Sequence, residues 1–301
     1  MTRGERVIAF IHKYCLVPEG RLVGQPMELM DFQKKFITDI YDNPAGTSRA
    51  YLVMARKNGK SALIAAICLA HIVGPEARQN SQIVSGAMSR EQASLIFKLM
   101  QKMIGLSPDL RSKSVTRITP SQKMITGVMM NVEYRAISAE AGTAHGLSPV
   151  LVLIDEIGQI RGPRSDFIDA LTTSQGAHDN PLLIALSTQA ATDNDLLSRL
   201  IDDAESSQDP RVVSHVYKAP DGCDLLDRNA WLAANPALGV FRSEQDMADL
   251  AATADRIPSE ANKFMWLNLN QRIEATSPFI SKKLWDSCDG TLLPLEDGAT
   301  I

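Results

Sequence analysis

A short polar segment carries residue types that bind phosphate. It lies between a strand-like apolar run and the helical pattern of residues 62–72. It contains Gly59, Lys60 and Ser61. In a phosphate-binding loop, backbone N–H groups and the N-terminus of the following helix surround the phosphates. Lys60 would then reach the β- and γ-phosphates, and the Ser61 hydroxyl would bind Mg²⁺. The same triplet also occurs as an ordinary helix start with a solvated lysine, and Met54 stands where the pattern asks for glycine.

A second signal is an apolar run that ends in two acids. Residues 151–154 read Leu-Val-Leu-Ile and precede Asp155 and Glu156. A buried strand of this kind would deliver Asp155 to the Mg²⁺ shell at the carboxyl edge of a sheet. Glu156 would polarise the attacking water. The alternative is a strand end that reaches solvent, with the aspartate as a helix cap, but two adjacent acids at a buried strand end are costly unless a cation balances them.

Two further signals are weaker by themselves. Ser187, Thr188 and Gln189 follow the apolar run 181–186, where polar groups beside the two acids could sense the γ-phosphate. Ser-Thr is also common in turns and helix caps. Gln33 lies before the first strand, and its amide could both donate to and accept from adenine, although exposed helical glutamines are common.

Strand-like and helical patterns alternate along the first two thirds of the chain, which predicts a mostly parallel α/β sheet flanked by helices. Residues 114–137 read as short strands inserted at the sheet edge. We expect an N-terminal helix and arm over 1–25, an ATPase core over 26–205, a small helical lid subdomain over 206–275 and a linker over 276–301. Helices are expected at 28–37, 62–72, 90–103, 167–173 and 196–204, and strands at 51–54, 81–85, 150–154, 181–187 and 212–217.

Composition excludes several classes of protein. The chain has 301 residues, of which 45% are apolar and 22% charged, with a net charge of −4. There is thus no global basic field for nucleic acid, and DNA contacts must come from a local patch or from several subunits together. The four cysteines form no C-x-x-C pair, which argues against a zinc or disulfide framework. No apolar run reaches the ~20 residues of a membrane span, so no membrane association is expected.

In this order, the signals resemble the ATPase half of the large terminase subunit of tailed bacteriophages. The segment 54–61, with its Arg-Lys-Asn run, looks like the terminase form of the phosphate-binding motif, so Met54 becomes an expected feature. The segment 144–147, Trp231 and Asn235-Pro236 also resemble this family. The resemblance covers about residues 20–285. It implies a P-loop NTPase fold of the ASCE type, RecA-like, with a helical lid.

The resemblance also implies functional residues. ATP would be held by Gln33, Arg56, Lys57, Asn58, Gly59, Lys60 and Ser61, and Mg²⁺ by Ser61 and Asp155. Glu156 and Arg56 would be catalytic, and the polar run after residue 186 would couple hydrolysis to movement. The implied function is ATP-driven translocation of double-stranded viral DNA into the procapsid. The implied partners are the portal protein, the small terminase subunit and further copies of the chain in a ring, in the host cytoplasm.

Two departures from the family pattern affect these expectations. Many members carry an arginine where His145 stands, and this arginine is thought to enter a neighbouring subunit's site. Histidine is mostly neutral at pH 7, so Arg135, Arg161 or Arg164 could take that role instead. The chain also stops where the family's nuclease domain is expected to begin. We therefore expect no nuclease activity from this chain alone.

Two alternatives remain at this point. A helicase-like, DNA-dependent ATPase would normally need a second ATPase-like domain, for which the residues after 205 are too few. A non-catalytic nucleotide-binding protein that docks on the capsid would not need Glu156. A turnover assay separates these alternatives from the DNA-packaging ATPase.

Overall fold

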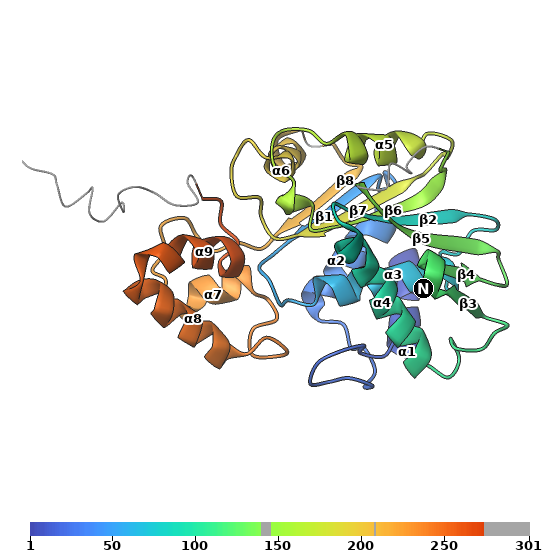
Figure 1. Ribbon diagram of the computed structural model, residues 1–301, viewed down its shortest axis with the longest axis horizontal. Coiled ribbons are helices and arrows are strands. Elements are labelled where there is room, and N and C mark those ends of the chain that lie inside the picture. Colours follow the sequence, from blue (N-terminus) through green and yellow to red (C-terminus); the bar gives the residue numbers. More distant parts are fainter. Residues whose placement is uncertain (140–145, 208, 274–301) are drawn as a thin grey trace, which may run out of the picture.

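The computed structural model describes residues 1–139, 146–207 and 209–273, and its centre is an eight-stranded sheet. The strand order is β3-β4-β5-β2-β6-β7-β1-β8 (Figure 1). The six strands from β5 to β8 along this order run parallel, and β4 pairs antiparallel with β3 and β5. This confirms the predicted mostly parallel α/β sheet.

The strands and helices have the following bounds. The strands are β1 (Arg49–Val53), β2 (Gln82–Ala87), β3 (Thr116–Thr119), β4 (Met124–Gly127), β5 (Val132–Ser138), β6 (Pro149–Asp155), β7 (Leu182–Ser187) and β8 (Val212–Val216). The helices are α1 (Arg3–Tyr14), α2 (Asp31–Tyr41), α3 (Lys60–Ile72), α4 (Arg90–Leu106), α5 (Asp166–Ser174), α6 (Leu196–Ser206), α7 (Arg228–Ala234), α8 (Glu244–Arg256) and α9 (Pro258–Asn268), with short 3-10 turns η1 (Pro120–Gln122) and η3 (Ile157–Gln159).

Two apolar clusters cover the two faces of the sheet, and the strands supply alternate residues to each. On β6, Leu151 and Leu153 pack with helices α1 to α4, whereas Val152 and Ile154 pack with α5, α6 and η3. Figure 1 shows the sheet between these two layers, with α5 and α6 on one side and α1 to α4 on the other. Side chains on a strand alternate between faces, so a strand covered on both sides must be apolar throughout. This explains why all seven residues of β6 are buried.

Helix α3 lies at the centre of the larger cluster. Eleven of its residues are buried, including Lys60 and His71. A helix that is apolar on all sides gains its stability from burial against several neighbours. Helix α3 therefore holds the phosphate-binding segment, at its N-terminus, rigidly against the sheet.

Most predicted elements are found close to their expected places. The strands predicted between 114 and 137 form a meander at the sheet edge, and its last strand, β5, pairs in parallel with β2. The helix expected from residue 28 begins later, at Asp31. Gln33 explains the later start, because its side-chain Oε1 accepts a hydrogen bond from the backbone N–H of Met30 at 2.9 Å and so caps the helix.

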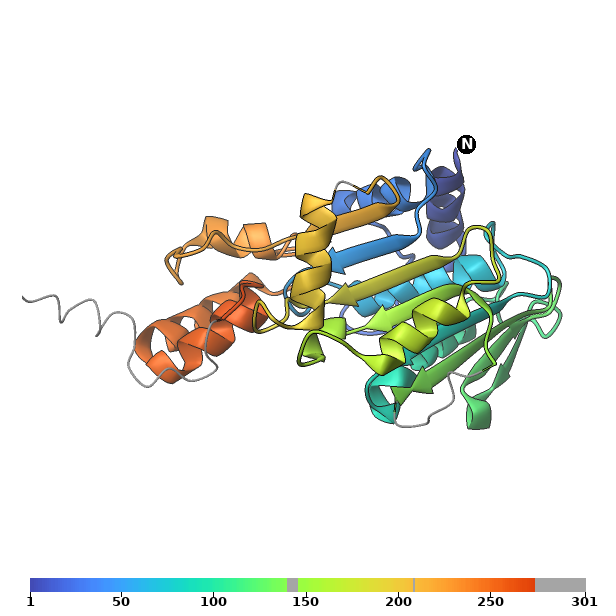
Figure 2. The ribbon, with the colours of Figure 1, turned by 90° about the horizontal axis from the view of Figure 1, so that it is seen from above.

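Strand β8 differs from the predicted domain division. It pairs with β1 over its whole length, so residues 212–216 complete the central sheet instead of belonging to the helical subdomain expected over 206–275. The helical part begins only after this strand, and α7, α8 and α9 enclose a small core around Trp231, Met247 and Phe264. Figures 1 and 2 show these helices beyond the carboxyl ends of β1 and β7. Within the described ranges, no helix is both long and apolar enough to span a bilayer.

Candidate active site

The phosphate-binding segment connects β1 to α3, as the sequence predicts. Gly59 has φ +77°, and this left-handed backbone turns the chain into the helix. The Lys60 side chain is 6% exposed, and its Nζ donates to the carbonyl oxygens of Met54 at 2.8 Å and Ala55 at 2.9 Å. Burial lowers the pKa of Lys60 to about 8, although the charges of Glu156 and Asp155 oppose this change. The lysine thus bridges its own loop, with an ammonium group that phosphate oxygens could bind.

Asp155 ends β6 beside the start of α3. Its Oδ2 accepts from the Ser61 hydroxyl at 3.3 Å, and its buried Oδ1 has no hydrogen-bond partner within the described residues. Burial and then the charge of Glu156 raise the pKa of Asp155 to about 6, against the effect of Lys60. A carboxylate oxygen without a partner beside a hydroxyl is a donor set that suits Mg²⁺, which takes one or two protein ligands together with phosphate and water. No group of three acidic, His or Cys side chains in the described ranges forms a separate metal site.

Glu156 is held by the end of β7. Its backbone is left-handed, with φ +56°, and its Oε2 accepts from the Thr188 hydroxyl at 3.2 Å and, at 3.4 Å each, from the Ser187 hydroxyl and the Thr188 N–H. The strand end lies very close to η3, because a Cβ added to Gly158 would lie 2.4 Å from the Thr188 carbonyl oxygen. These bonds fix the Glu156 carboxylate at the carboxyl edge of the sheet, at the residue next to Asp155.

The third residue of this polar run has a different role. The backbone N–H of Gln189 donates to the Asn270 side chain at 2.7 Å, and its carbonyl accepts from the indole N–H of Trp266 at 2.7 Å. Its own side-chain Oε1 is buried without a partner within the described residues. The polar run that holds Glu156 is therefore bonded directly to the helical part.

A cavity of about 750 Å³ opens beside the phosphate-binding segment. Its walls come from the arm between α1 and α2, from the start of α3, from α4, and from the turn at Val240 and Phe241. Gln33 lies in its wall with its side-chain Nε2 3.8 Å from the point where a Cβ of Gly59 would lie. The volume is within the range of sites for small ligands. Six of the seven predicted nucleotide residues line this cavity, namely Gln33, Lys57, Asn58, Gly59, Lys60 and Ser61. Arg56 is not among the lining residues.

Asn58 lines the cavity, but its side chain serves the protein itself. Its Nδ2 donates to the Asn235 side chain at 2.9 Å and to the carbonyls of Ala55 and Arg56, and its Oδ1 accepts from the Ala237 N–H. The residue is 1% exposed. The structure thus favours Asn58 as a clamp between the loop and the helical part over a direct contact with nucleotide.

Arg242 is a polar residue near this site that the sequence does not reveal. It is 2% exposed, and its guanidinium donates to the Arg56 carbonyl oxygen and, at 2.7 Å, to the Asn268 side chain. Burial lowers the pKa of Arg242, opposed by the charge of Asp246. No local motif marks the residue, since its partners come from segments far away in the sequence. Arg242 and Asn58 meet at the same carbonyl of the phosphate-binding loop.

The other two residues of the Arg-Lys-Asn run are exposed. Lys57 Nζ forms a 3.1 Å ion pair with Asp246 of α8, and Arg56 is anchored by its backbone N–H, which donates to the Leu267 carbonyl at 3.0 Å. An exposed ion pair of this kind contributes little stability. Breaking the pair between Lys57 and Asp246 therefore costs little free energy.

The residues expected to act on a neighbouring subunit lie in different surroundings. Arg161 pairs with the buried Asp195 at 3.3 Å and lies over the Trp266 ring, with its Cζ 5.5 Å from the ring centroid. Arg135 pairs with Glu133 on β5 at 3.2 Å. Arg164 is exposed. His145 lies outside the described residues.

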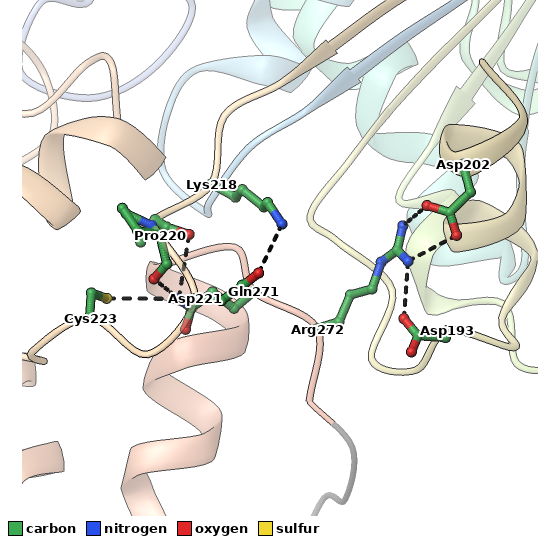
Figure 3. A network of polar contacts seen from close by, with 9 residues as sticks. Asp193, Asp202, Lys218, Pro220, Asp221, Cys223, Gln271 and Arg272 are labelled. Atoms are coloured by element: carbon green, nitrogen blue, oxygen red, sulfur yellow. Dashed lines mark hydrogen bonds and ion pairs between the residues drawn. The ribbon is translucent and has the colours of Figure 1, made fainter. Parts of the chain in front are cut away.

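A polar network joins the residues that follow α9 to the rest of the chain. Arg272 forms ion pairs with Asp202 of α6 at 2.6 Å and with Asp193 at 3.0 Å, and Gln271 donates to the Pro220 carbonyl at 2.7 Å (Figure 3). The helical part is thus joined to the rest of the chain at the phosphate-binding loop and, through Arg272, at α6 and the segment before it.

The fold and this site define a P-loop NTPase of the ASCE type, because β7 lies between the strand of the phosphate-binding loop and the strand of the two acids. The protein-family model of the terminase large subunit ATPase domain matches residues 31–207. The family model of the terminase large subunit endonuclease domain matches residues 207–297. The chain therefore belongs to the terminase large subunit family.

Individual relatives agree with this assignment. The chain is 62% identical over 288 residues to the large terminase subunit of Enterobacteria phage HK97, covering 96% of this chain and 57% of that protein. The crystal structure of the HK97 large terminase superposes with a TM-score of 0.87 at 61% identity, over 96% of this chain and 59% of that one. A variant ATPase domain of the Thermus phage P74-26 large terminase shares the fold, with a TM-score of 0.54 at 15% identity over 86% of this chain and all of that one. The chain thus spans somewhat more than half the length of its HK97 relatives.

The endonuclease match corrects one expectation. We expected the chain to stop where the nuclease domain begins, yet that domain's family model matches residues 207–297. The described part of this range consists of β8, which completes the ATPase sheet, and the helices α7 to α9.

Proposed function

We propose that this chain binds and hydrolyses ATP at the cavity beside α3. Lys60 exchanges the carbonyls of Met54 and Ala55 for the β- and γ-phosphates, since an anionic ligand offers a buried ammonium stronger hydrogen bonds than neutral carbonyls do. Ser61 and Asp155 hold Mg²⁺, which neutralises charge on the phosphates when bound. Gln33 faces the base, and Arg56 and Lys57 turn toward the phosphates.

Glu156 acts as the general base that orients the attacking water. The single observation that carries the proposal is the position of this carboxylate, held by Ser187 and Thr188 next to Asp155. A protein that only binds nucleotide has no need for a second, separately oriented acid. The bonds from Gln189 to Asn270 and Trp266 support a role of this polar run in coupling loss of the γ-phosphate to movement of the helical part.

The family and the HK97 relative support a role in DNA packaging. We infer that the chain is the ATPase part of a motor that translocates double-stranded viral DNA into the procapsid. In this role it would associate with the portal protein, the small terminase subunit and other copies of itself, in the host cytoplasm.

The two alternatives make different predictions. A helicase-like ATPase would hydrolyse ATP in response to DNA without a portal. A non-catalytic docking protein would bind ATP without turnover.

A cation from a neighbouring copy would complete the site only in the ring assembly, where it stabilises charge on the transferring phosphoryl group. The candidates for this cation are Arg135, Arg161, Arg164 and His145.

The test measures ATP binding and turnover in two variants. Lys60→Ala should abolish ATP binding or turnover, whereas Lys98→Ala, which removes an exposed lysine from α4, should leave both unchanged. Glu156→Gln should keep binding but lower kcat by about 10² or more, the usual scale for a positioned general base. Glu91→Gln, on the exposed start of α4, is its control. Normal turnover in the Glu156→Gln variant would place the catalytic acid elsewhere.

A further inference from the structure

Three apolar side chains are exposed in the wall of the cavity beside the phosphate-binding loop. Leu95 of α4 is 39% exposed, Val240 is 49% exposed and Phe241 is 39% exposed. Exposed apolar side chains that gather in a concave site commonly mark the place of a ligand's apolar part. The phosphate-binding residues line the same cavity, so its wall offers groups for both the phosphates and the apolar base of a nucleotide.

Phe241 is the aromatic member of this group, and it lies against the phosphate-binding loop. A Cβ added to Gly59 would lie 3.0 Å from the Cε2 and Cζ atoms of the Phe241 ring. The same point is 3.8 Å from the side-chain Nε2 of Gln33. The ring and the amide thus approach the loop at one place, and they come from elements more than two hundred residues apart in the chain.

The turn that carries Phe241 is fixed from both sides. Gly239 has φ +81°, and its N–H donates to the Arg242 carbonyl at 2.9 Å, which closes the turn. Arg242 anchors the turn to the Arg56 carbonyl, and Arg21 of the N-terminal arm donates to the Val240 carbonyl at 2.9 Å. A ring held in this way loses little conformational freedom when a ligand binds against it.

We propose that Phe241 contacts the purine base of the bound nucleotide by its ring face, while Gln33 bonds to the base edge. A purine has flat apolar faces and a polar edge, and this pair of side chains offers a group for each. The helical part would then sense the base directly through Phe241. This proposal rests on the proposed function, because it needs nucleotide phosphates at Lys60.

The experiment compares ADP with inorganic tripolyphosphate, which has phosphates but no base. Aromatic stacking on a base typically changes affinity by about 5-fold to 100-fold when the aromatic residue is replaced by alanine. Phe241→Ala should raise the dissociation constant of ADP by such a factor. The inhibition constant of tripolyphosphate, measured in competition with ADP, should stay unchanged. Leu250→Ala removes a similarly exposed apolar side chain from α8, outside the cavity, and should change neither.

A second variant gives an independent signal. Phe241→Trp should keep ADP affinity and report base contact by quenched tryptophan emission on adding ADP, but not on adding tripolyphosphate. Unchanged ADP affinity in Phe241→Ala, equal weakening of both ligands, or unchanged emission of the Trp variant would overturn the proposal. Failure of the folded wild-type chain to bind ADP would instead overturn the proposed function.

Discussion

The buried carboxyl of Asp155 leads to a prediction about stability that does not need catalysis. Burial and the charge of Glu156 raise its pKa from the ordinary value of 3.8 to about 6. The folded protein therefore favours the protonated carboxyl more strongly than the unfolded chain does. The cost of ionising Asp155 is absent below about pH 4, grows as the pH rises and is complete above about pH 6. Asp155→Asn removes this cost, so the variant should gain stability relative to the wild type as the pH rises.

The size of this gain follows from the same pKa. A change from 3.8 to about 6 corresponds to about 3 kcal/mol between acidic and neutral pH. Asp155 is 5% exposed, so solvent screening reduces this little. The attraction between Asp155 and Lys60 is already included in this pKa, because Lys60 lowers it against the effects of burial and Glu156. The pH-dependent gain of the variant should therefore be about 3 kcal/mol.

Urea unfolding between pH 4 and pH 7, without Mg²⁺ or nucleotide, measures this difference. The free energy of unfolding of the Asp155→Asn variant should rise relative to that of the wild type across this range. Asp179→Asn, which removes an exposed carboxyl, should follow the wild type at every pH. Mg²⁺ with ATP should reverse the order at pH 7, because ligand binding stabilises only the chain that binds it. If the difference between the two unfolding free energies does not change with pH, the raised pKa of the buried Asp155 carboxyl is refuted.

Three further predictions concern the loop clamp, assembly and DNA cleavage. Asn58→Ala should lower the free energy of unfolding by about 1–3 kcal/mol, because it leaves buried groups of Asn235 and of the loop without partners. It should also raise the ADP dissociation constant. Urea unfolding and calorimetry measure these two quantities, and wild-type values for both would contradict the role of Asn58 as a clamp. ATPase activity per subunit should rise with protein concentration or on adding portal and DNA, and an inactive arginine variant among Arg161→Ala, Arg164→Ala and Arg135→Ala should regain turnover when mixed with the Glu156→Gln variant. Concentration-independent activity without such complementation would mean that one subunit contains the whole site. The chain alone should not nick plasmid DNA with Mg²⁺ or Mn²⁺, and nicking that a point substitution in this chain abolishes would contradict that expectation.

The sequence by itself determined the parts of the site whose neighbours are close along the chain. Gly59-Lys60-Ser61 at a strand-to-helix turn and Asp155-Glu156 at a strand end each have a local pattern, because one turn or one strand end sets their geometry. The alternation of strand-like and helical segments along the chain likewise predicted a parallel α/β sheet. The meeting of Ser61 with Asp155 then follows from the parallel order, which brings strand ends to one edge.

Only the tertiary structure decided the contacts that join distant segments. The Asn58 amide binds Asn235, and the Arg242 guanidinium donates to the Arg56 carbonyl. In both cases the sequence around one residue gives no indication of the other. Strand β8 is similar: its short, half-buried sequence reads equally well as part of a lid, and pairing with β1 alone assigns it to the sheet. The physical reason is that local propensity and periodicity report on neighbours within one element, whereas buried polar contacts depend on which elements the whole chain packs together.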